Sequence, residues 1–229
     1  MSKEGSSLAK GRLWRTDGAR SALRLALQLE GLGAADASAR DPVGEVLLPA
    51  YLCDTVIPPF RQRGLGVRFY DVRPDLSVDL ADLSRRLGDQ TGQGRIWAVL
   101  FIHYFGFLQP EPVRRFFADL RHRGFGAGSP LVLEDLTHAV WTDLPGGPVG
   151  DYAVASYRKF GLPFDGGFLW ARDADNAASG ADSARGRARR ASGGPGAEPD
   201  LHTWASHAHC LSALAWATEA AGRPADRLW

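Results

Sequence analysis

Two short segments of this sequence place reactive side chains directly after apolar runs. Residues 131–133 are apolar and lead into two carboxylates, of which Asp135 is the second. Residues 152–155 are also apolar, and they are followed by Ser156 and, three positions later, by Lys159. Only three of the 27 basic residues are lysines, and Lys159 is the one beyond the first ten residues. The body of the chain therefore carries a single primary amine.

Apolar runs of this kind are typical of buried strands, and ligands of open α/β sheets bind at the carboxyl ends of the strands. If the two strands are neighbours or one apart, at a spacing of about 4.8 Å, Asp135 and Lys159 lie about one aromatic ring from each other. Pyridoxal phosphate (PLP) chemistry requires this pair. A lysine amine forms an imine with the aldehyde, and a carboxylate keeps the ring nitrogen protonated. The hydroxyl of Ser156 and the backbone N–H groups at Ala19 and Arg20, where a helix starts, can cradle the phosphate.

The rest of the pattern predicts the elements that position these groups. Further apolar runs predict strands at residues 46–48, 67–70 and 96–102. Helices are expected at residues 21–29, 54–63, 79–87 and 111–123, the second of them interrupted or delayed by Pro58 and Pro59. Strands that alternate with helices predict a three-layer α/β/α fold with a mostly parallel sheet.

Composition divides the chain into four parts. Residues 1–14 are polar and are expected to form a flexible tail, whereas residues 15–171 form the main domain. Residues 172–200 contain no aromatic residue and no Leu, Ile, Val or Met, so we expect a disordered linker. Residues 201–229 carry apolar residues among good helix formers and predict a C-terminal helix.

The overall composition excludes several classes of protein. The 27 basic and 26 acidic residues give a net charge of +1, which provides no chain-wide attraction to nucleic acid or to an anionic membrane. Cys53 and Cys210 are too few for a disulfide framework, and the polar N-terminus lacks a signal-peptide core. The longest apolar run, residues 96–102, is too short to span a bilayer. A cytoplasmic protein is expected.

Six segments together resemble the DegT/StrS-type sugar aminotransferases, in order and with similar spacing, over about residues 17–171. They are residues 45–51, 69–72, 101–106, 133–135, 151–156 and 166–167. The resemblance implies the large domain of a PLP-dependent transferase of fold type I, with a seven-stranded, mostly parallel sheet. It also implies a homodimer whose active sites lie at the subunit interface.

The resemblance also implies roles for individual residues. Lys159 would be the catalytic lysine that binds the cofactor, and Asp135 the partner of the pyridinium nitrogen. Ser156 would be a phosphate ligand, and Ala19 and Arg20 match the family's Gly-Thr phosphate turn.

Two further positions match less closely. His138 lies where the family commonly has Gln near the ring hydroxyl, and Cys53 lies where a residue packs on the face of the ring. The interval from Ser156 to Lys159 is shorter than is usual in the family, although it is common among other enzymes of fold type I.

The expected activity is transfer of an amino group from a glutamate-like amino acid to a nucleotide-linked keto sugar. The lysine argues against the family's dehydratase branch, which lacks it. Family members continue after the paired glycines into a small domain, and by this resemblance we expect that domain to be largely missing from the sequence. Three explanations follow from this expectation. The chain is a fragment, or a partner chain completes its site, or it is a non-catalytic homologue that serves as a dimer partner or scaffold.

Several other patterns favour plainer interpretations. His103 at the end of a strand is at least as well explained as a core or edge histidine. The spacing of His202, His207, His209 and Cys210 does not predict a metal site. The arginines of residues 185–190 are typical of a solvated linker, with nucleic-acid recruitment as the alternative. A β-lactamase-like serine nucleophile would need Ser-Asp-Asn and Lys-Thr-Gly, and neither tripeptide occurs.

Overall fold

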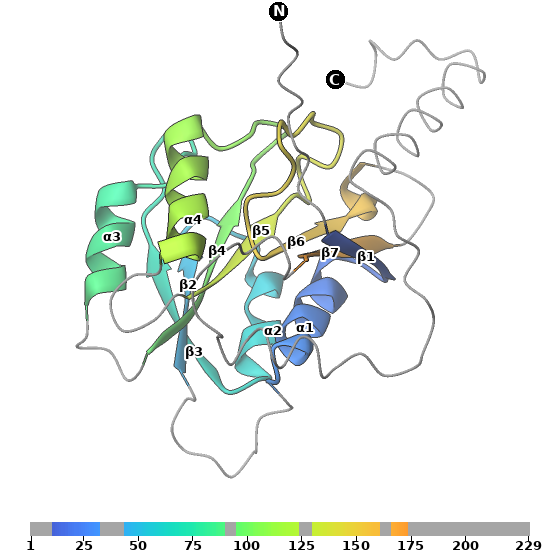
Figure 1. Cartoon of the computed structure of the whole chain (residues 1–229), viewed down its shortest axis with the longest axis horizontal. Helices are drawn as coiled ribbons and strands as arrows, with labels where there is room; N and C mark the ends of the chain where they lie inside the picture. The colour runs from blue at the N-terminus through green and yellow to red at the C-terminus, as the bar shows by residue number, and fades with distance from the viewer. Residues whose placement is uncertain (1–10, 33–43, 90–94, 124–129, 161–165, 174–229) are drawn as a thin grey trace, which may run out of the picture.

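A seven-stranded mixed sheet forms the centre of the molecule, in the order β1-β7-β6-β5-β4-β2-β3 (Figure 1). The computed structural model describes residues 11–32, 44–89, 95–123, 130–160 and 166–173. The strands are β1 (Gly11–Thr16), β2 (Gly44–Pro49), β3 (Leu65–Tyr70), β4 (Ile96–Ile102), β5 (Leu131–Asp135), β6 (Tyr152–Ser156) and β7 (Gly167–Arg172). The pairs from β3 to β6 are parallel, and β7 runs antiparallel to both β6 and β1. The prediction of a mostly parallel sheet is confirmed.

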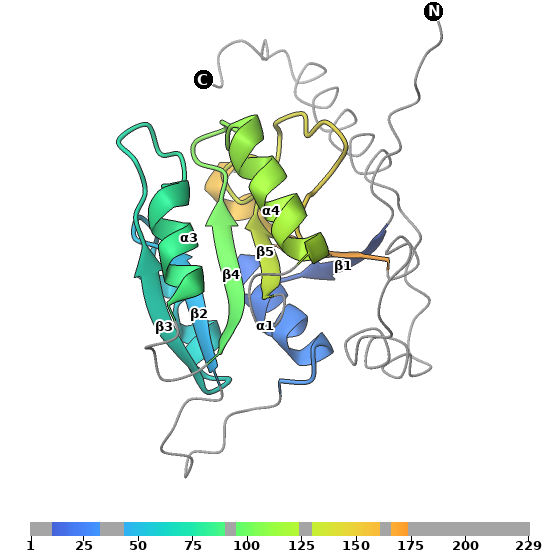
Figure 2. The same cartoon turned by 60° about the vertical axis from the view of Figure 1, so that its left-hand side comes forward.

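Helices cover both faces of this sheet (Figure 2). They are α1 (Ala19–Leu29), α2 (Pro58–Arg61), α3 (Leu80–Gly88) and α4 (Glu111–Arg123), with one-turn 3-10 helices η1 (Asp54–Val56) and η2 (Tyr157–Phe160). One core cluster lies under α1 and α2, and a second lies under α3 and α4. The three-layer α/β/α arrangement is therefore confirmed.

The central strands are continuously apolar because both of their faces are buried. Successive side chains of a strand point to opposite faces. In β4, Leu100 accordingly belongs to the cluster under α1, and Phe101 belongs to the cluster under α4. Phe101 stacks on Phe117 of α4, with 4.1 Å between the ring centroids. The two layers of helices thereby hold the carboxyl ends of β4, β5 and β6 in fixed positions.

The structure corrects two boundaries. Arg172, which the sequence analysis placed at the start of the linker, is the last residue of β7. Residues 11–14 belong to β1 and not to a flexible tail, because β1 pairs along its whole length with β7, from Gly11 opposite Arg172 to Thr16 opposite Gly167. The predicted interruption at Pro58 and Pro59 is confirmed, since η1 ends before a separate α2. Residues 1–10, the predicted linker from residue 174 onward and the predicted C-terminal helix at 201–229 lie outside the described residues.

No helix among the described residues combines the length and the apolar character that a membrane span requires.

Candidate functional site

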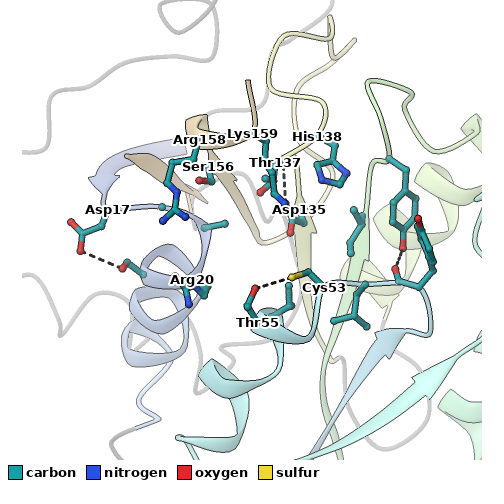
Figure 3. Close-up of a pocket in the computed structure, with 18 of the residues that line it drawn as sticks. Asp17, Arg20, Cys53, Thr55, Asp135, Thr137, His138, Ser156, Arg158 and Lys159 are labelled. Carbon is teal, nitrogen blue, oxygen red and sulfur yellow. Dashed lines mark hydrogen bonds between the residues drawn. The ribbon is translucent and has the colours of Figure 1, made fainter. Parts of the chain in front are cut away.

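A pocket of about 910 Å³ opens at the carboxyl ends of β4, β5 and β6 (Figure 3). Because β5 and β6 are parallel neighbours, Asp135 and the segment that carries Lys159 emerge at the same edge of the sheet. All residues that the sequence predicted for a cofactor site line this pocket: Ala19, Arg20, Cys53, Asp135, His138, Ser156 and Lys159. The individual roles of these residues remain predictions.

One end of the pocket is formed by the start of α1 and by Ser156. No side chain among the described residues caps this helix, so its first backbone N–H groups lack a side-chain acceptor there. Gly18 precedes the helix with a φ of 155°, and a Cβ atom there would lie 3.3 Å from Ser156 Oγ. A Cβ atom on Gly167 would lie only 2.8 Å from Gly18 Cα. These two glycines allow the helix start and the serine hydroxyl to approach each other, and together they form a cradle for an anion.

Lys159 lies on η2, directly after β6, with its side chain exposed. Ser156 is the last residue of β6, and Lys159 lies in the single turn of η2 that follows it. The short interval between them therefore still brings the hydroxyl and the amine to one pocket. Arg158 and Arg20 also line the pocket, which gives its rim a positive charge.

Asp135 ends β5 with only 5% of its surface exposed. The backbone N–H of Thr137 donates to its Oδ1 at 2.7 Å. Burial raises the pKa of Asp135, and the bond from Thr137 and the nearby His138 and His103 oppose this increase only in part. A cation placed against this carboxylate would offset the cost of burying its charge.

His138 and Cys53 line other parts of the pocket. His138 is half-buried, and its ring stacks on Phe105 with 5.3 Å between centroids and 17° between planes. Burial lowers the pKa of His138, the charge of Asp135 raises it, and the charge of Lys159 lowers it further. Cys53 is exposed across from Asp135, and its Sγ lies 3.1 Å from Thr55 Oγ1 (Figure 3).

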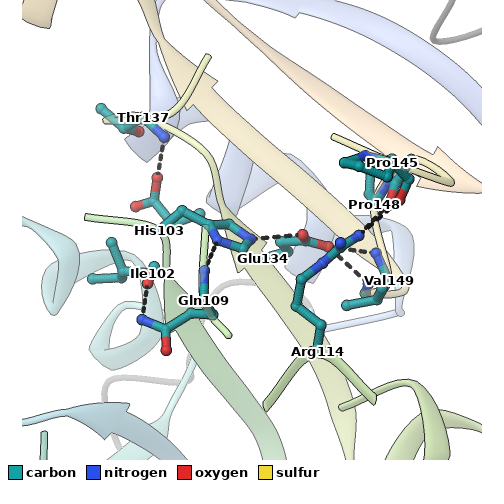
Figure 4. A network of polar contacts seen from close by, with 12 residues as sticks. Ile102, His103, Gln109, Arg114, Glu134, Thr137, Pro145, Pro148 and Val149 are labelled. Atoms are coloured by element: carbon teal, nitrogen blue, oxygen red, sulfur yellow. Dashed lines mark hydrogen bonds and ion pairs between the residues drawn. The ribbon is translucent and has the colours of Figure 1, made fainter. Parts of the chain in front are cut away.

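Behind the pocket lies a network of buried polar groups (Figure 4). His103 Nε2 lies 2.9 Å from Glu134 Oε1, and both side chains are fully buried. The backbone N–H of Gln109 donates to His103 Nδ1 at 2.8 Å, so Nδ1 is an acceptor and Nε2–H donates to Glu134. Glu134 Oε2 accepts from the N–H groups of Val149 and Gly150 at 2.7 and 2.9 Å. His103 is thus a core histidine with both nitrogens bonded, as the plainer interpretation expected.

This network also fixes the end of β5. The backbone N–H of His103 donates to the carbonyl oxygen of Asp135 at 3.0 Å. Glu134 connects the same strand to the loop at residues 145–150, and Arg114 of α4 donates to the carbonyl oxygens of Pro145 and Gly147. The carboxylate of Asp135 therefore projects from a strand end that is held from two sides.

Sequence reasoning missed part of the pocket wall. The aromatic residues Tyr51, Tyr104 and Phe105 line the pocket, as does Arg24 from α1. The only local signal for Phe105 is that it precedes a glycine just after an apolar strand, which indicates a turn at the ligand-binding edge of the sheet. Nothing in the sequence indicates that its ring stacks on His138.

Solved structures share this fold. The sugar aminotransferase CalS13 from Micromonospora echinospora matches with a TM-score of 0.56 and 26% sequence identity, over 78% of this chain and 44% of that protein. A DegT DnrJ EryC1 StrS aminotransferase from Brucella abortus matches with a TM-score of 0.57 and 18% identity, over 72% of this chain and 43% of that protein. An Escherichia coli GDP-4-keto-6-deoxy-D-mannose-3-dehydratase with bound hydrated PLP matches with a TM-score of 0.53 and 19% identity, over 70% and 39%.

The comparisons have a clear limit. The chain spans less than half of the length of each of these structures. No protein-family model and no curated protein matches the sequence. The matches confirm the fold predicted from the sequence, which is that of the large domain of PLP-dependent aminotransferases of fold type I.

Proposed function

We propose that this chain, which resembles the DegT/DnrJ/EryC1/StrS sugar aminotransferases in sequence pattern and in structure, is the cofactor-binding domain of a PLP-dependent aminotransferase. Its reaction would transfer an amino group from a glutamate-like amino acid to a nucleotide-linked keto sugar. The observation that carries this proposal is the convergence of one amine, one buried carboxylate and one uncapped helix start on a single pocket.

The residues present fit PLP. A dianionic phosphate suits the N–H groups at the start of α1, the hydroxyl of Ser156 and the positive rim. A protonated ring nitrogen suits Asp135, whose buried carboxylate accepts a hydrogen bond from the backbone N–H of Thr137. The pocket volume of about 910 Å³ lies in the upper part of the usual range for ligand sites, which leaves space for a substrate beside the cofactor.

When bound, PLP supplies an aldehyde that condenses with amines and a ring that accepts electrons. Lys159 would hold the cofactor through Nζ, and its amine would take up and return the substrate's proton as a general base and acid. The negative charge of Asp135 would stabilise a proton on the ring nitrogen. The fixed end of β5 orients this carboxylate.

The presence of Lys159 also favours amino transfer over dehydration, because its amine can move the substrate's proton. The Escherichia coli dehydratase shares the fold at 19% identity, so the fold by itself does not distinguish the two reactions.

A second candidate is a non-catalytic homologue that keeps the PLP fold and acts as a dimer partner or scaffold. Its support is that the chain spans only 44% of the CalS13 structure. Such a protein would bind the cofactor without turning over any amino donor.

We also propose that a second copy of the chain covers the mouth of the pocket. Tyr51, Phe105 and Phe107 are large aromatic residues with 52%, 55% and 78% of their surfaces exposed. Tyr51 and Phe105 line the pocket itself, so a partner that covers them would also shield the site from water.

The central test replaces Lys159 with Ala in the full chain. Mixed with PLP, the wild type should develop the visible absorbance of an imine, and borohydride should fix the label on the peptide that contains Lys159. K159A should lose the absorbance, the label and all transamination. The control is Lys10→Ala, which removes the lysine of the other Ser-x-x-Lys sequence, Ser7 to Lys10. An unchanged spectrum in K159A refutes the assignment, and a wild type that forms the imine but turns over no donor favours the scaffold.

A further inference from the structure

Phe105 adopts a backbone conformation that aromatic residues rarely adopt. It follows β4 and has a φ of 51°, and Gly106 after it has a φ of 89°. The N–H of Phe107 donates to the carbonyl oxygen of Tyr104 at 2.8 Å, which closes a tight turn. The Cβ atom makes a positive φ unfavourable, and Gly or Asn would fit the first position of this turn better. A strained bulky residue beside a pocket indicates a role for its side chain.

The side chain of Phe105 contacts His138. The two rings stack at 5.3 Å with 17° between their planes, although they come from different connections, one after β4 and one after β5. More than half of the Phe105 surface is exposed within this chain, so packing inside the chain does not explain the strained position of the ring. The stack covers one face of the imidazole at the wall of the pocket.

The two nitrogens of His138 lie in different surroundings. Nδ1 is buried and has no hydrogen-bond partner among the described residues. Nε2 is not buried in this way, and no described residue forms a hydrogen bond with it. Nε2 is therefore the nitrogen that is open to the pocket. A buried N–H without an acceptor is more unfavourable than a buried lone pair without a donor. The neutral ring with its proton on Nε2 is therefore favoured, whereas the imidazolium would place an unsatisfied N–H at Nδ1.

We propose that Phe105 is a positioning residue, whose ring holds His138 as a neutral Nε2–H donor toward the pocket. His138 is then a fixed hydrogen-bond donor to the ligand and not an acid or base. This assignment of tautomer and charge concerns the chain alone, and only the identity of the ligand as PLP rests on the proposed function.

Charged groups on two other elements face the imidazole. The carboxylate of Asp135 at the end of β5 favours a charged ring, and the amine of Lys159 on η2 opposes it. Phe105, from the connection after β4, brings no charge but excludes water from one face. Burial outweighs the carboxylate, so the pKa of His138 is lowered, in agreement with the geometry.

The first test is nitrogen NMR of the histidines in the cofactor-free full chain, with the signal of His138 assigned by its loss in His138→Gln. The wild type should show the Nε2–H tautomer, with a titration midpoint below that of a free histidine. Phe105→Ala should expose Nδ1 to water, mix the tautomers and raise the midpoint. The control is Phe69→Ala on β3, which removes a partly exposed ring of the same size that does not line the pocket, and it should leave the signal unchanged. An ordinary midpoint in the wild type, or an unchanged signal in F105A, overturns the proposal.

The second test asks whether Phe105 acts through His138. F105A should weaken PLP binding about two- to tenfold, as expected for the loss of one aromatic pair. In a His138→Ala background, F105A should cause no further loss of PLP affinity, because the residue that Phe105 positions is absent. An equal loss in both backgrounds would show that Phe105 contacts the ligand by itself. If the wild type does not bind PLP, the proposed function fails, while the NMR result still decides the role of Phe105.

Discussion

Replacing Gly18 with Ala is the most direct way to perturb the anion cradle without removing a polar group. Gly18 precedes α1 with φ 155° and ψ 178°, a region open almost only to glycine. Forcing an alanine into it costs about 1–3 kcal/mol of folding free energy. The new Cβ would also lie 3.3 Å from Ser156 Oγ and 3.8 Å from Ser156 Cβ, so either the serine or the helix start must move.

That movement affects the phosphate more than the rest of the cofactor. Losing one hydrogen bond to a charged group costs about 1.5–3 kcal/mol, so G18A should bind PLP about 10- to 150-fold more weakly. Pyridoxal lacks the phosphate, and its affinity should stay the same. The difference between the two ligands therefore isolates the cradle from a general loss of stability.

The matched control is Gly31→Ala, just after the other end of α1. Gly31 also has a positive φ, 81°, but nothing lies within 4 Å of a Cβ placed there. Both variants should lower the unfolding temperature measured by circular dichroism, and only G18A should change the PLP titration followed by absorbance. Equal PLP affinities in the two variants, or an equal loss for PLP and pyridoxal in G18A, would refute the assignment of the cradle.

Two further predictions concern charge and assembly. Because burial raises the pKa of Asp135, the folded cofactor-free protein holds this proton more tightly than the unfolded chain, and its stability falls as the pH rises through the folded pKa. Asp135→Asn should remove that decrease with rising pH, measured by urea unfolding, and should weaken PLP binding, whereas parallel pH profiles of the two proteins would contradict the reasoning. Phe107→Asp places a charge on the most exposed aromatic residue among those described and should convert a dimer to a monomer in sedimentation velocity. A monomeric wild type would exclude the second copy as the cover of the pocket.

The buried strands were predictable because their apolar runs are continuous, and residues 131–135 and 152–156 also revealed the reactive pair. β1 was not predictable in the same way. It lies at the edge of the sheet, and only its first residue, Gly11, is buried, so its pairing with β7, its one partner strand among the described residues, defines it. The antiparallel direction of β7 was not predictable either, because an apolar run does not show in which direction its strand pairs.

The network around Glu134 shows a second limit of the sequence. A polar residue at the end of each of two apolar runs, His103 and Glu134, is a signal that each needs a partner. The chain separates the two by 31 positions, so only the pairing of β4 with β5 identifies them as each other's partner. The Phe105–His138 stack depends in the same way on two turns whose geometry local sequence does not specify.

The buried His103–Glu134 pair also restricts how this protein can diverge. An apolar substitution of either residue alone leaves its partner without a hydrogen bond in a dry interior, which is costly. Exchanging both for apolar groups is costly as well, because the N–H groups of Gln109, Val149 and Gly150 lose their acceptors. Lineages should therefore keep a hydrogen-bond acceptor at both positions. The rear of the pocket should accordingly tolerate few substitutions.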